Sequence, residues 1–102
     1  MIHVIAAIEL QPGRREEFLK LFRAHALNVR AEKGCVAYAP TIDAVGSPLP
    51  GHPPRDDVVT IVEQWRTLAD LEAHLRAPHQ VAFLKQAAGL RLGASLQVLQ
   101  DV

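Results

Sequence analysis

Apolar residues recur with the period of a strand in some segments of this chain and with that of a helix in others, and the order of the segments limits the fold. The predicted elements are a strand over residues 1–10, a helix over 14–32, strands over 35–45 and 57–65, helices over 67–76 and 78–89, and a strand over 90–99. This is the ferredoxin-like order, in which helices cover one face of a four-stranded antiparallel sheet. We therefore predict one α+β domain over residues 1–102.

Local signals mark the ends of these elements. Gln11-Pro12-Gly13 forms a turn after the first strand, and Gly34 stops the first helix. Thr67, with Asp70 three residues later, predicts a capping box, and Pro78 suits the first turn of the helix that follows. One stripe of the first helix is expected to face the core and consists of Phe18, Leu21, Phe22, His25 and Val29.

The first strand carries apolar residues on both of its faces. Its even positions are all apolar from residue 2 to residue 10, and Ile5 and Ala7 are apolar on the opposite side. Val58 and Val59 give the third strand the same two-sided character. Because a sheet that is apolar on both faces is normally covered on both, we expect a homodimer that packs sheet against sheet.

The segment over residues 46–56 is rich in residues that restrict or redirect the backbone. It holds four prolines and two glycines and therefore has few accessible backbone states. Loops of this length in compact domains are often functional. We expect the loop to border the dimer or the mouth of a pocket.

Composition excludes several classes of function. The chain has eleven basic and eleven acidic side chains, and this balance argues against a nucleic-acid partner and against an anionic membrane surface. The apolar run of the first strand is interrupted by His3 and Glu9, is too short to span a bilayer and lacks the pattern of a signal peptide, so we expect a cytoplasmic protein. Cys35 is the only cysteine and is interpreted as a small buried residue rather than a reactive thiol.

Several short motifs occur in an order and spacing typical of one enzyme family. They are Glu32-Lys33-Gly34-Cys35, Tyr38-Ala39-Pro40, Glu63-Gln64-Trp65, Leu71-Glu72-Ala73-His74-Leu75 and Pro78-His79. On these residues the chain resembles the antibiotic biosynthesis monooxygenase (ABM) superfamily, and its tyrosine-alanine-proline run and proline-rich loop resemble the quinol monooxygenase branch. The segment from Val4 to Gly13 is similar to that family's first strand and turn, so the resemblance covers nearly the whole chain.

The resemblance implies a cofactor-independent monooxygenase that oxidises a quinol or another phenolic aromatic with molecular oxygen, using no flavin, haem or metal. It also implies a homodimer with a dimeric α+β barrel. A deprotonated quinol can pass an electron to dioxygen directly, so an apolar pocket, one base and donors for an oxyanion suffice. Haem-degrading members rely on an asparagine and a histidine at positions that fall near Ala6 and Leu84, and neither residue type is present there.

Histidines are the candidate bases, because their pKa lies close to neutrality. His74 is predicted at the flank of its helix's apolar stripe, where it is either half inside a pocket or a plain helix-boundary residue. His25 is either a hydrogen-bonded core residue or a base in a cavity between helix and sheet. His74 is the preferred catalytic base because it has the better access. The stripe beside His74 consists of Leu68, Leu71 and Leu75.

Aromatic and apolar side chains are expected to surround the base. Trp65 ends the third strand just before the second helix, so it is either core or pocket wall, and the Tyr38 hydroxyl is placed to reach a bound oxygen atom. The other residues expected to contact the substrate are His79, Phe22, Leu71 and Phe83.

Other sites and other functions are less well supported by the sequence. His74 and His79 are separated by a proline and do not share a helical face, and no carboxylate pair accompanies them, which argues against a metal site. No glycine-rich nucleotide-binding motif is present. Because fold does not determine chemistry, an isomerase or a haem-degrading enzyme on the same fold and a non-catalytic small-molecule-binding or stress-response domain remain alternatives.

Overall fold

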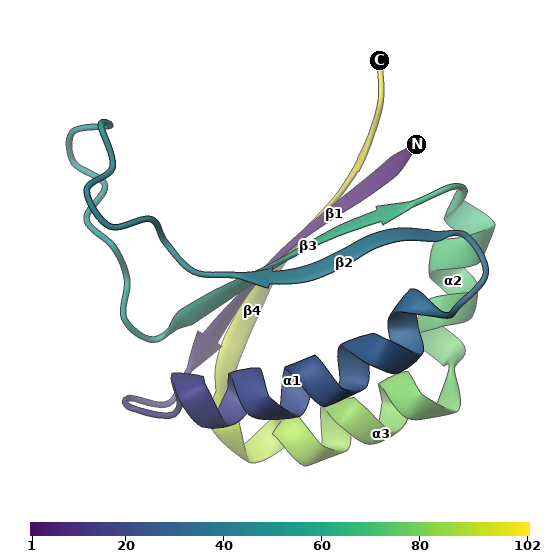
Figure 1. Cartoon of the computed structure of the whole chain (residues 1–102), viewed down its shortest axis with the longest axis horizontal. Helices are drawn as coiled ribbons and strands as arrows, with labels where there is room; N and C mark the ends of the chain where they lie inside the picture. The colour runs from purple at the N-terminus through teal and green to yellow at the C-terminus, as the bar shows by residue number, and fades with distance from the viewer.

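The computed structural model describes all of residues 1–102 and has the element order expected from the sequence (Figure 1). The elements are β1 (Ile2–Leu10), α1 (Arg15–Arg30), β2 (Cys35–Thr41), β3 (Val58–Trp65), α2 (Leu68–Arg76), α3 (Pro78–Ala87), the 3-10 helix η1 (Ala88–Leu90) and β4 (Arg91–Gln100). The strands form one antiparallel sheet in the order β2-β3-β1-β4. This arrangement confirms the predicted ferredoxin-like α+β fold.

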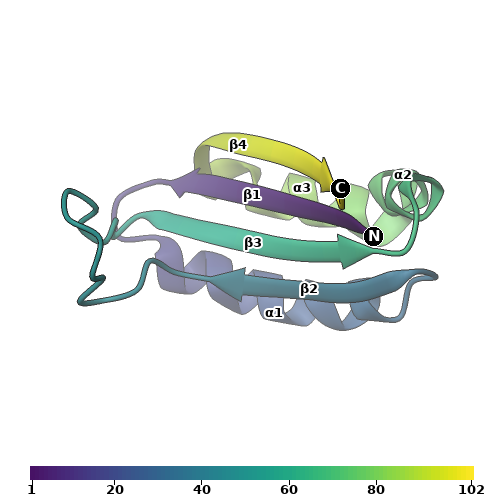
Figure 2. The same cartoon turned by 90° about the horizontal axis from the view of Figure 1, so that it is seen from above.

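All of the helices lie on one side of the sheet. Figure 2 views the sheet from its uncovered side, with β1 and β3 in the centre and with α1 and α3 behind them. The short helix α2 stands at the end of the sheet where β3 finishes. This placement brings the start of α2 close to the corner between α1 and β2.

The strand register determines which side chains enter the core. The even residues of β1 face the helices and are buried, and Ala6 pairs with Ile61 of β3 and Leu96 of β4. The opposite side of β1 carries Ile5 and Ala7, which stay partly exposed, as the two-sided pattern predicted. Burial of each large apolar side chain of the core stabilises the fold by roughly 1.5–3 kcal/mol.

The predicted stripe of α1 forms the helical half of the core. Phe18, Phe22, His25 and Val29 are buried, and Leu21 is partly buried against the same cluster. The rings of Phe18 and Phe22 both lie 5.9 Å from the ring of Phe83 in α3. The two long helices are therefore joined by aromatic contacts.

A tight corner connects α1 to β2 and places it against α2. Gly34 has a φ of +79°, and any Cβ at this position would collide with the side chain of Asp70. The Gly34 carbonyl accepts a hydrogen bond from the Arg66 N–H at 2.9 Å. The Asp70 N–H donates to Thr67 Oγ1 at 3.1 Å, which confirms Thr67 as the cap of α2. These contacts hold the end of α1 beside the start of α2.

The second strand is shorter than predicted. β2 ends at Thr41 instead of continuing to residue 45, because Asp43 turns towards the loop and accepts hydrogen bonds from Arg55. The Arg55 guanidinium donates to both Asp43 carboxylate oxygens, at 2.7 and 2.9 Å, and this pairing holds the pKa of Asp43 at about 2. Residues 42–57 form an arm that projects from the sheet on the side away from the helices (Figure 1).

The remaining boundaries agree with the prediction to within a few residues. Pro78 occupies the first turn of α3, as expected, and η1 closes the helical region before β4 begins. No helix in the structure combines the length and the apolar character that crossing a membrane requires.

Candidate active site

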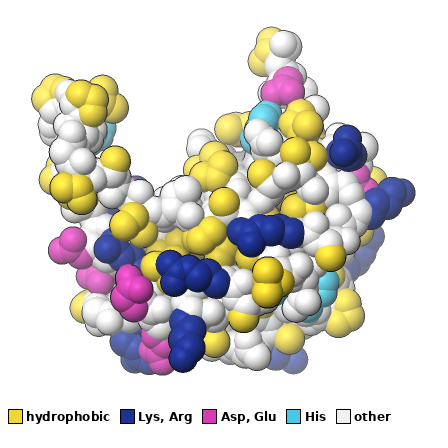
Figure 3. Space-filling model, in the orientation of Figure 1, with side chains coloured by type: hydrophobic (Ala, Val, Ile, Leu, Met, Phe, Trp, Pro, Cys, Tyr) yellow, Lys and Arg dark blue, Asp and Glu magenta, His cyan; other side chains and the backbone are white.

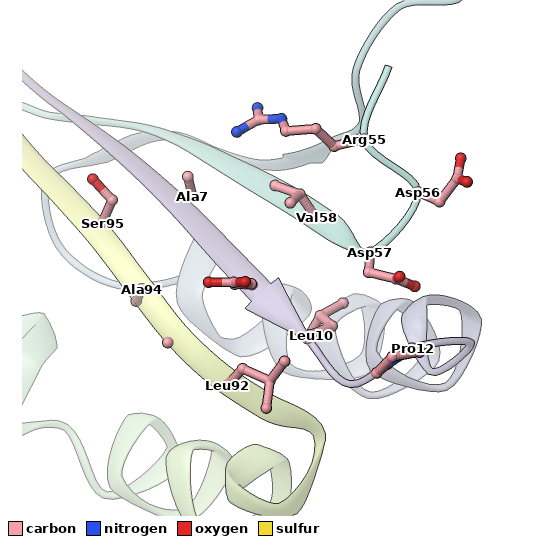
Figure 4. Close-up of a pocket in the computed structure, with 12 residues that line it drawn as sticks. Ala7, Leu10, Pro12, Arg55, Asp56, Asp57, Val58, Leu92, Ala94 and Ser95 are labelled. Carbon is pink, nitrogen blue, oxygen red and sulfur yellow. The ribbon is translucent and has the colours of Figure 1, made fainter. Parts of the chain in front are cut away.

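Two concavities lie on opposite faces of the sheet. The larger has a volume of about 770 Å³ and opens on the uncovered face, at the base of the arm (Figure 4). Two of its charged residues are held by the protein: Arg55 pairs with Asp43, and Asp57 accepts the Gly13 N–H at 3.0 Å. These contacts fasten the arm and the first turn to the sheet.

The second concavity has a volume of about 290 Å³ and lies between the sheet and the helices. Twelve of its sixteen lining residues are hydrophobic. Its mouth is formed by side chains that are exposed, namely Leu75, Leu84, Leu96 and Val98. The polar groups that converge on it belong to Tyr38, Glu63, His74, Gln80 and Arg91. Because an apolar cavity with a few converging polar groups is the usual form of a small-molecule site, this cavity is the candidate active site.

His74 lines the cavity but is fully buried rather than half-buried. The predicted apolar stripe of α2 is also wrong, because Leu71 and His74 face the core whereas Leu68 and Leu75 are exposed. α2 is short and stands at the end of the sheet. Only one narrow face of the helix, with residues three positions apart, therefore reaches the core. The His74 Nδ1–H donates to Glu32 Oε2 at 3.0 Å, and Nε2 makes no hydrogen bond in the protein.

Glu32 is the principal residue that the sequence reasoning missed. Its N–H donates to the Val29 carbonyl just beyond α1, and its Oε2 accepts from His79 Nε2 at 2.6 Å as well as from His74. The sequence argument against a carboxylate pair did not anticipate that this single carboxylate contacts both histidines. They lie on different helices, but one carboxylate joins them. The available signal was the position of Glu32 two residues before Gly34, which fixes the corner against α2.

Tyr38 of β2 is a further lining residue of the cavity. Burial is the main cause that raises the pKa of its phenol, and the carboxylates of Glu63 and Glu32 raise it further. The hydroxyl therefore stays protonated and can donate a hydrogen bond. The Tyr38 ring stacks on Phe22 at 5.1 Å and lies 5.5 Å from the His74 ring.

Trp65 is fully buried and does not line the cavity, so of its two interpretations the structure supports the core. Its Nε1–H donates to Glu63 Oε1 at 3.0 Å. Glu63 does line the cavity, and burial raises the pKa of its carboxyl. The sequence contained the signal for Glu63, because it alternates with Ile61 and Trp65 on the inward face of β3.

His25 is a hydrogen-bonded core residue. Its Nε2–H donates to Gln80 Oε1 at 2.7 Å, and its ring stacks on that of Phe83 at 4.3 Å. Burial is the main cause that lowers the pKa of His25. Gln80 lines the cavity whereas His25 does not, so His25 acts on the cavity wall through Gln80.

The other residues expected to contact the substrate divide into two groups. Leu71 and Phe83 line the cavity. Phe22 and His79 do not: Phe22 packs behind Tyr38, and His79 reaches the site only through Glu32.

Arg91 is a further cavity residue that the sequence reasoning did not identify. It is the first residue of β4, and its Nε is buried without a hydrogen-bond partner. Buried donors in native proteins are almost always paired. A bound molecule with an oxygen atom at this position would satisfy the Nε–H.

Cys35 lies at the start of β2 and is partly buried. Burial, with the charges of Glu32 and Glu63, raises the pKa of its thiol, which agrees with its interpretation as an unreactive residue. No group of three or more histidine, cysteine, aspartate and glutamate side chains has an arrangement that could hold a metal ion.

Comparison with known proteins places the chain among enzymes. The family model for antibiotic biosynthesis monooxygenase matches residues 1–86. The chain is 37% identical over 103 residues to the protein named Probable quinol monooxygenase YgiN of Escherichia coli K12, and the match covers 98% of this chain and 97% of that protein.

Solved structures give the same assignment of fold. PA3566 from Pseudomonas aeruginosa has a TM-score of 0.81 and 27% identity, with 99% of this chain and 93% of that chain covered. Rv0793 from Mycobacterium tuberculosis has a TM-score of 0.80 and 24% identity, with 99% and 94% covered. On the match of residues 1–86 and the identity that extends along nearly its whole length, the chain belongs to the antibiotic biosynthesis monooxygenase family.

Proposed function

We propose that this protein oxidises a quinol, or another small phenolic aromatic, with molecular oxygen and without a cofactor. The observation that carries the proposal is His74 at the wall of an apolar cavity, with its Nε2 free of hydrogen bonds and its ring 5.5 Å from that of Tyr38, which also lines the cavity. Membership of the family supports the oxidation, and the name of the Escherichia coli relative supports a quinol as the substrate.

In this mechanism His74 is the general base. Glu32 accepts the Nδ1–H, so the neutral imidazole carries its lone pair on Nε2, where it can take the phenolic proton. The Glu32 carboxylate then stabilises the imidazolium that forms. A positioned base of this kind accelerates proton transfer roughly 10²- to 10⁴-fold.

Deprotonation prepares the substrate for reaction with dioxygen. The phenolate transfers one electron to dioxygen, and the two radicals combine into a ring-bound peroxide. When the O–O bond breaks, one oxygen atom stays on the ring and the other leaves as water, with the two hydrogens that the quinol has lost. The product is a hydroxyquinone, and no external reductant is consumed because the substrate supplies all the electrons.

Donors in the cavity hold the oxygen atoms. The protonated Tyr38 hydroxyl can stabilise the negative charge of the phenolate or the peroxide, and preorganised donors of this type are among the strongest contributors to catalysis. Arg91 can bind a second oxygen through its unpaired Nε–H. The assignment predicts a substrate with oxygen atoms at two separated positions, as in a quinol.

The size of the cavity limits the substrate further. Small-molecule pockets commonly measure about 300–1,000 Å³, and a volume of about 290 Å³ lies at the lower end of that range. One or two aromatic rings fit such a space better than a larger polycycle. His25 has a supporting role in this scheme, because it holds the Gln80 amide at the wall.

We also propose that the working form is a homodimer. The uncovered face of the sheet carries partly exposed Ile5, Ala7 and Val62. The arm and the C-terminal end stand out from the body and leave a hollow between them on this side (Figure 3). A second sheet packed into this hollow would cover the apolar residues, and the arm over residues 42–57 would border the partner.

Oxygen-isotope labelling tests the proposed function directly. The purified protein is incubated with menadiol under ¹⁸O₂, and oxygen uptake and product mass are followed against no-protein and heat-denatured controls. Uptake above both controls, with one ¹⁸O atom in the product, is expected. Uptake with no label in the product would mean that the protein is an oxidase of quinols and would refute monooxygenation. Binding of menadiol without any acceleration would favour a small-molecule-binding domain.

A further inference from the structure

The Glu32 carboxylate receives two histidine hydrogen bonds on a single oxygen atom. Glu32 Oε2 accepts from His74 Nδ1 at 3.0 Å and from His79 Nε2 at 2.6 Å. Glu32 lies in the turn after α1, His74 in α2 and His79 in α3. We refer to His74, Glu32 and His79 as the proton cluster.

The hydrogen bonds determine where the hydrogens of the proton cluster lie. A carboxylate can only accept hydrogen bonds, so His74 Nδ1 and His79 Nε2 must both be donors. The remaining nitrogens, Nε2 of His74 and Nδ1 of His79, make no hydrogen bond in the protein. The cluster therefore has two open ends, one at each histidine.

The two ends face different surroundings. The side chain of His74 is 2% exposed, that of Glu32 is 14% exposed and that of His79 is 31% exposed. His74 lines the cavity, whereas Glu32 and His79 do not. The proton cluster thus runs from the wall of an apolar cavity to the surface of the molecule.

Protonation of a base in such a cavity is electrostatically unfavourable. When His74 takes a proton, a positive charge appears in a region of low dielectric constant, where charges are strongly unfavourable unless they are compensated. Glu32 supplies one negative charge, but His79 competes for it if its own ring is positive. The charge on His79 therefore influences how readily His74 accepts a proton.

We propose that the proton cluster exchanges protons between the cavity and solvent, with Glu32 and His79 as positioning residues for His74. The exchange requires that the cluster holds one extra proton, on His79, before the substrate binds. When His74 Nε2 takes the phenolic proton, His79 releases its Nδ1 proton to water, so the charge of the cluster stays at zero. Both hydrogen bonds to Glu32 are kept throughout, and no ring has to rotate.

The same exchange serves the second half of the reaction. When the O–O bond breaks, His74 returns its proton to the departing oxygen atom, and His79 recovers one from water. The inference rests on the proposed function, which requires a proton to leave the phenol and another to reach the leaving oxygen. Other titratable groups border the cluster: the His25 ring lies 5.7 Å from that of His79, the Tyr38 ring lies 5.5 Å from that of His74, and Glu63 and Cys35 are also close.

The first test is independent of turnover. ¹⁵N NMR of the imidazole nitrogens in the ligand-free protein near neutral pH reports which nitrogens carry hydrogen, and His74→Gln and His79→Gln assign the signals. His74 is expected to be protonated on Nδ1 alone, and His79 on both nitrogens. A neutral His79, or a His74 protonated on Nε2, would overturn the proposal. If the spectra are as expected but the protein does not oxidise a quinol, the proposed function is refuted, whereas the proposed distribution of charge in the cluster is supported.

The second test is kinetic and uses His79→Gln, whose side-chain amide can still donate to Glu32 but cannot titrate. Its kcat for quinol oxidation is expected to fall about tenfold or more, within the range of positioned proton-transfer groups, with KM close to that of the wild type. Added imidazole should restore part of kcat in this variant and change little in the wild type. A kcat equal to that of the wild type at every imidazole concentration would overturn the proposal.

Matched variants separate this role from a structural one. His52→Gln makes the same change at an exposed histidine of the arm, and Glu72→Gln removes an exposed carboxylate from α2. Both are expected to keep the wild-type kcat and thermal stability. Glu32→Gln should lower kcat, and Glu32→Asp, which keeps a carboxylate, should recover part of it. Equal kcat values for folded Glu32→Gln and Glu32→Asp would contradict the need for the charge.

Discussion

The indole ring of Trp65 lies 4.8 Å from the imidazole ring of His74, and both side chains are fully buried. The same indole donates its Nε1–H to Glu63, which lines the cavity. Trp65 therefore supports two cavity residues from behind without touching the cavity itself. The rigidity of the site depends on this contact, because a base must be held within a fraction of an ångström to be effective.

Replacement of Trp65 by phenylalanine should destabilise the protein mainly through Glu63. The change removes ring volume and leaves a buried carboxylate without its donor, so we expect the free energy of unfolding to fall by about 2 kcal/mol or more. Urea unfolding measures the effect. In a Glu63→Gln background the loss should be smaller, because the unpaired charge is no longer present. Identical losses in the two backgrounds would contradict the coupling.

The buried carboxyl of Glu63 should make stability depend on pH. Burial raises its pKa in the folded protein, so above about pH 4 the folded state retains a proton that the unfolded chain has lost. The contribution of Glu63 to the free energy of unfolding of the wild type therefore falls as pH rises through the folded-state pKa of its carboxyl. Glu63→Gln removes the effect, and the stability of the variant relative to the wild type should therefore increase with pH. Parallel curves of unfolding free energy from pH 4 to 8 would rule this out.

Tyr38→Phe removes the hydroxyl and keeps the aromatic ring. The ring can keep its 5.1 Å stack on Phe22, so the melting temperature should change little. Loss of one preorganised donor to an oxyanion should lower kcat for quinol oxidation by roughly a hundredfold, as measured by oxygen uptake. Full activity in the variant would show that this hydroxyl does not stabilise the reacting oxygen.

A charge placed on the uncovered face should prevent dimer formation. Ile5 pairs with Val62 in the centre of that face, and a lysine there would be desolvated by a second sheet. Sedimentation at micromolar concentration should show a dimer for the wild type and a monomer for Ile5→Lys. Leu27→Lys is the matched control, because Leu27 is an exposed apolar residue on α1. A wild-type monomer, or a dimer that Ile5→Lys leaves intact, would refute the sheet-to-sheet arrangement.

Most of the fold could be predicted because its elements carry strong local signals. The alternation in β1, the stripe of α1 and the cap at Thr67 are each set by residues a few positions apart, and all are present in the structure. The end of β2 could not be predicted in the same way. It depends on the pairing of Asp43 with Arg55, two residues that meet only after the arm has folded.

The candidate site was harder to predict because its contacts join distant parts of the chain. Glu32 meets residues 42 and 47 positions later in the sequence, and no local period indicates this. His74 and Tyr38 could be proposed from their motifs, but burial of His74 and the position of Trp65 behind it depend on how α2 sits at the end of the sheet. Arg91 was missed because its significance lies in a buried Nε without a hydrogen-bond partner, which only the folded structure reveals.

The most direct test of the central claim compares two equally conservative histidine variants. His74→Gln and His25→Gln each replace a buried histidine with an amide, but only His74 lines the cavity. Oxygen uptake with a quinol is measured for both, after circular dichroism has shown that both are folded. His74→Gln is expected to lose about a hundredfold or more in kcat, while His25→Gln keeps most of its activity. A folded His74→Gln protein with the wild-type rate would contradict the assignment of His74 as the base.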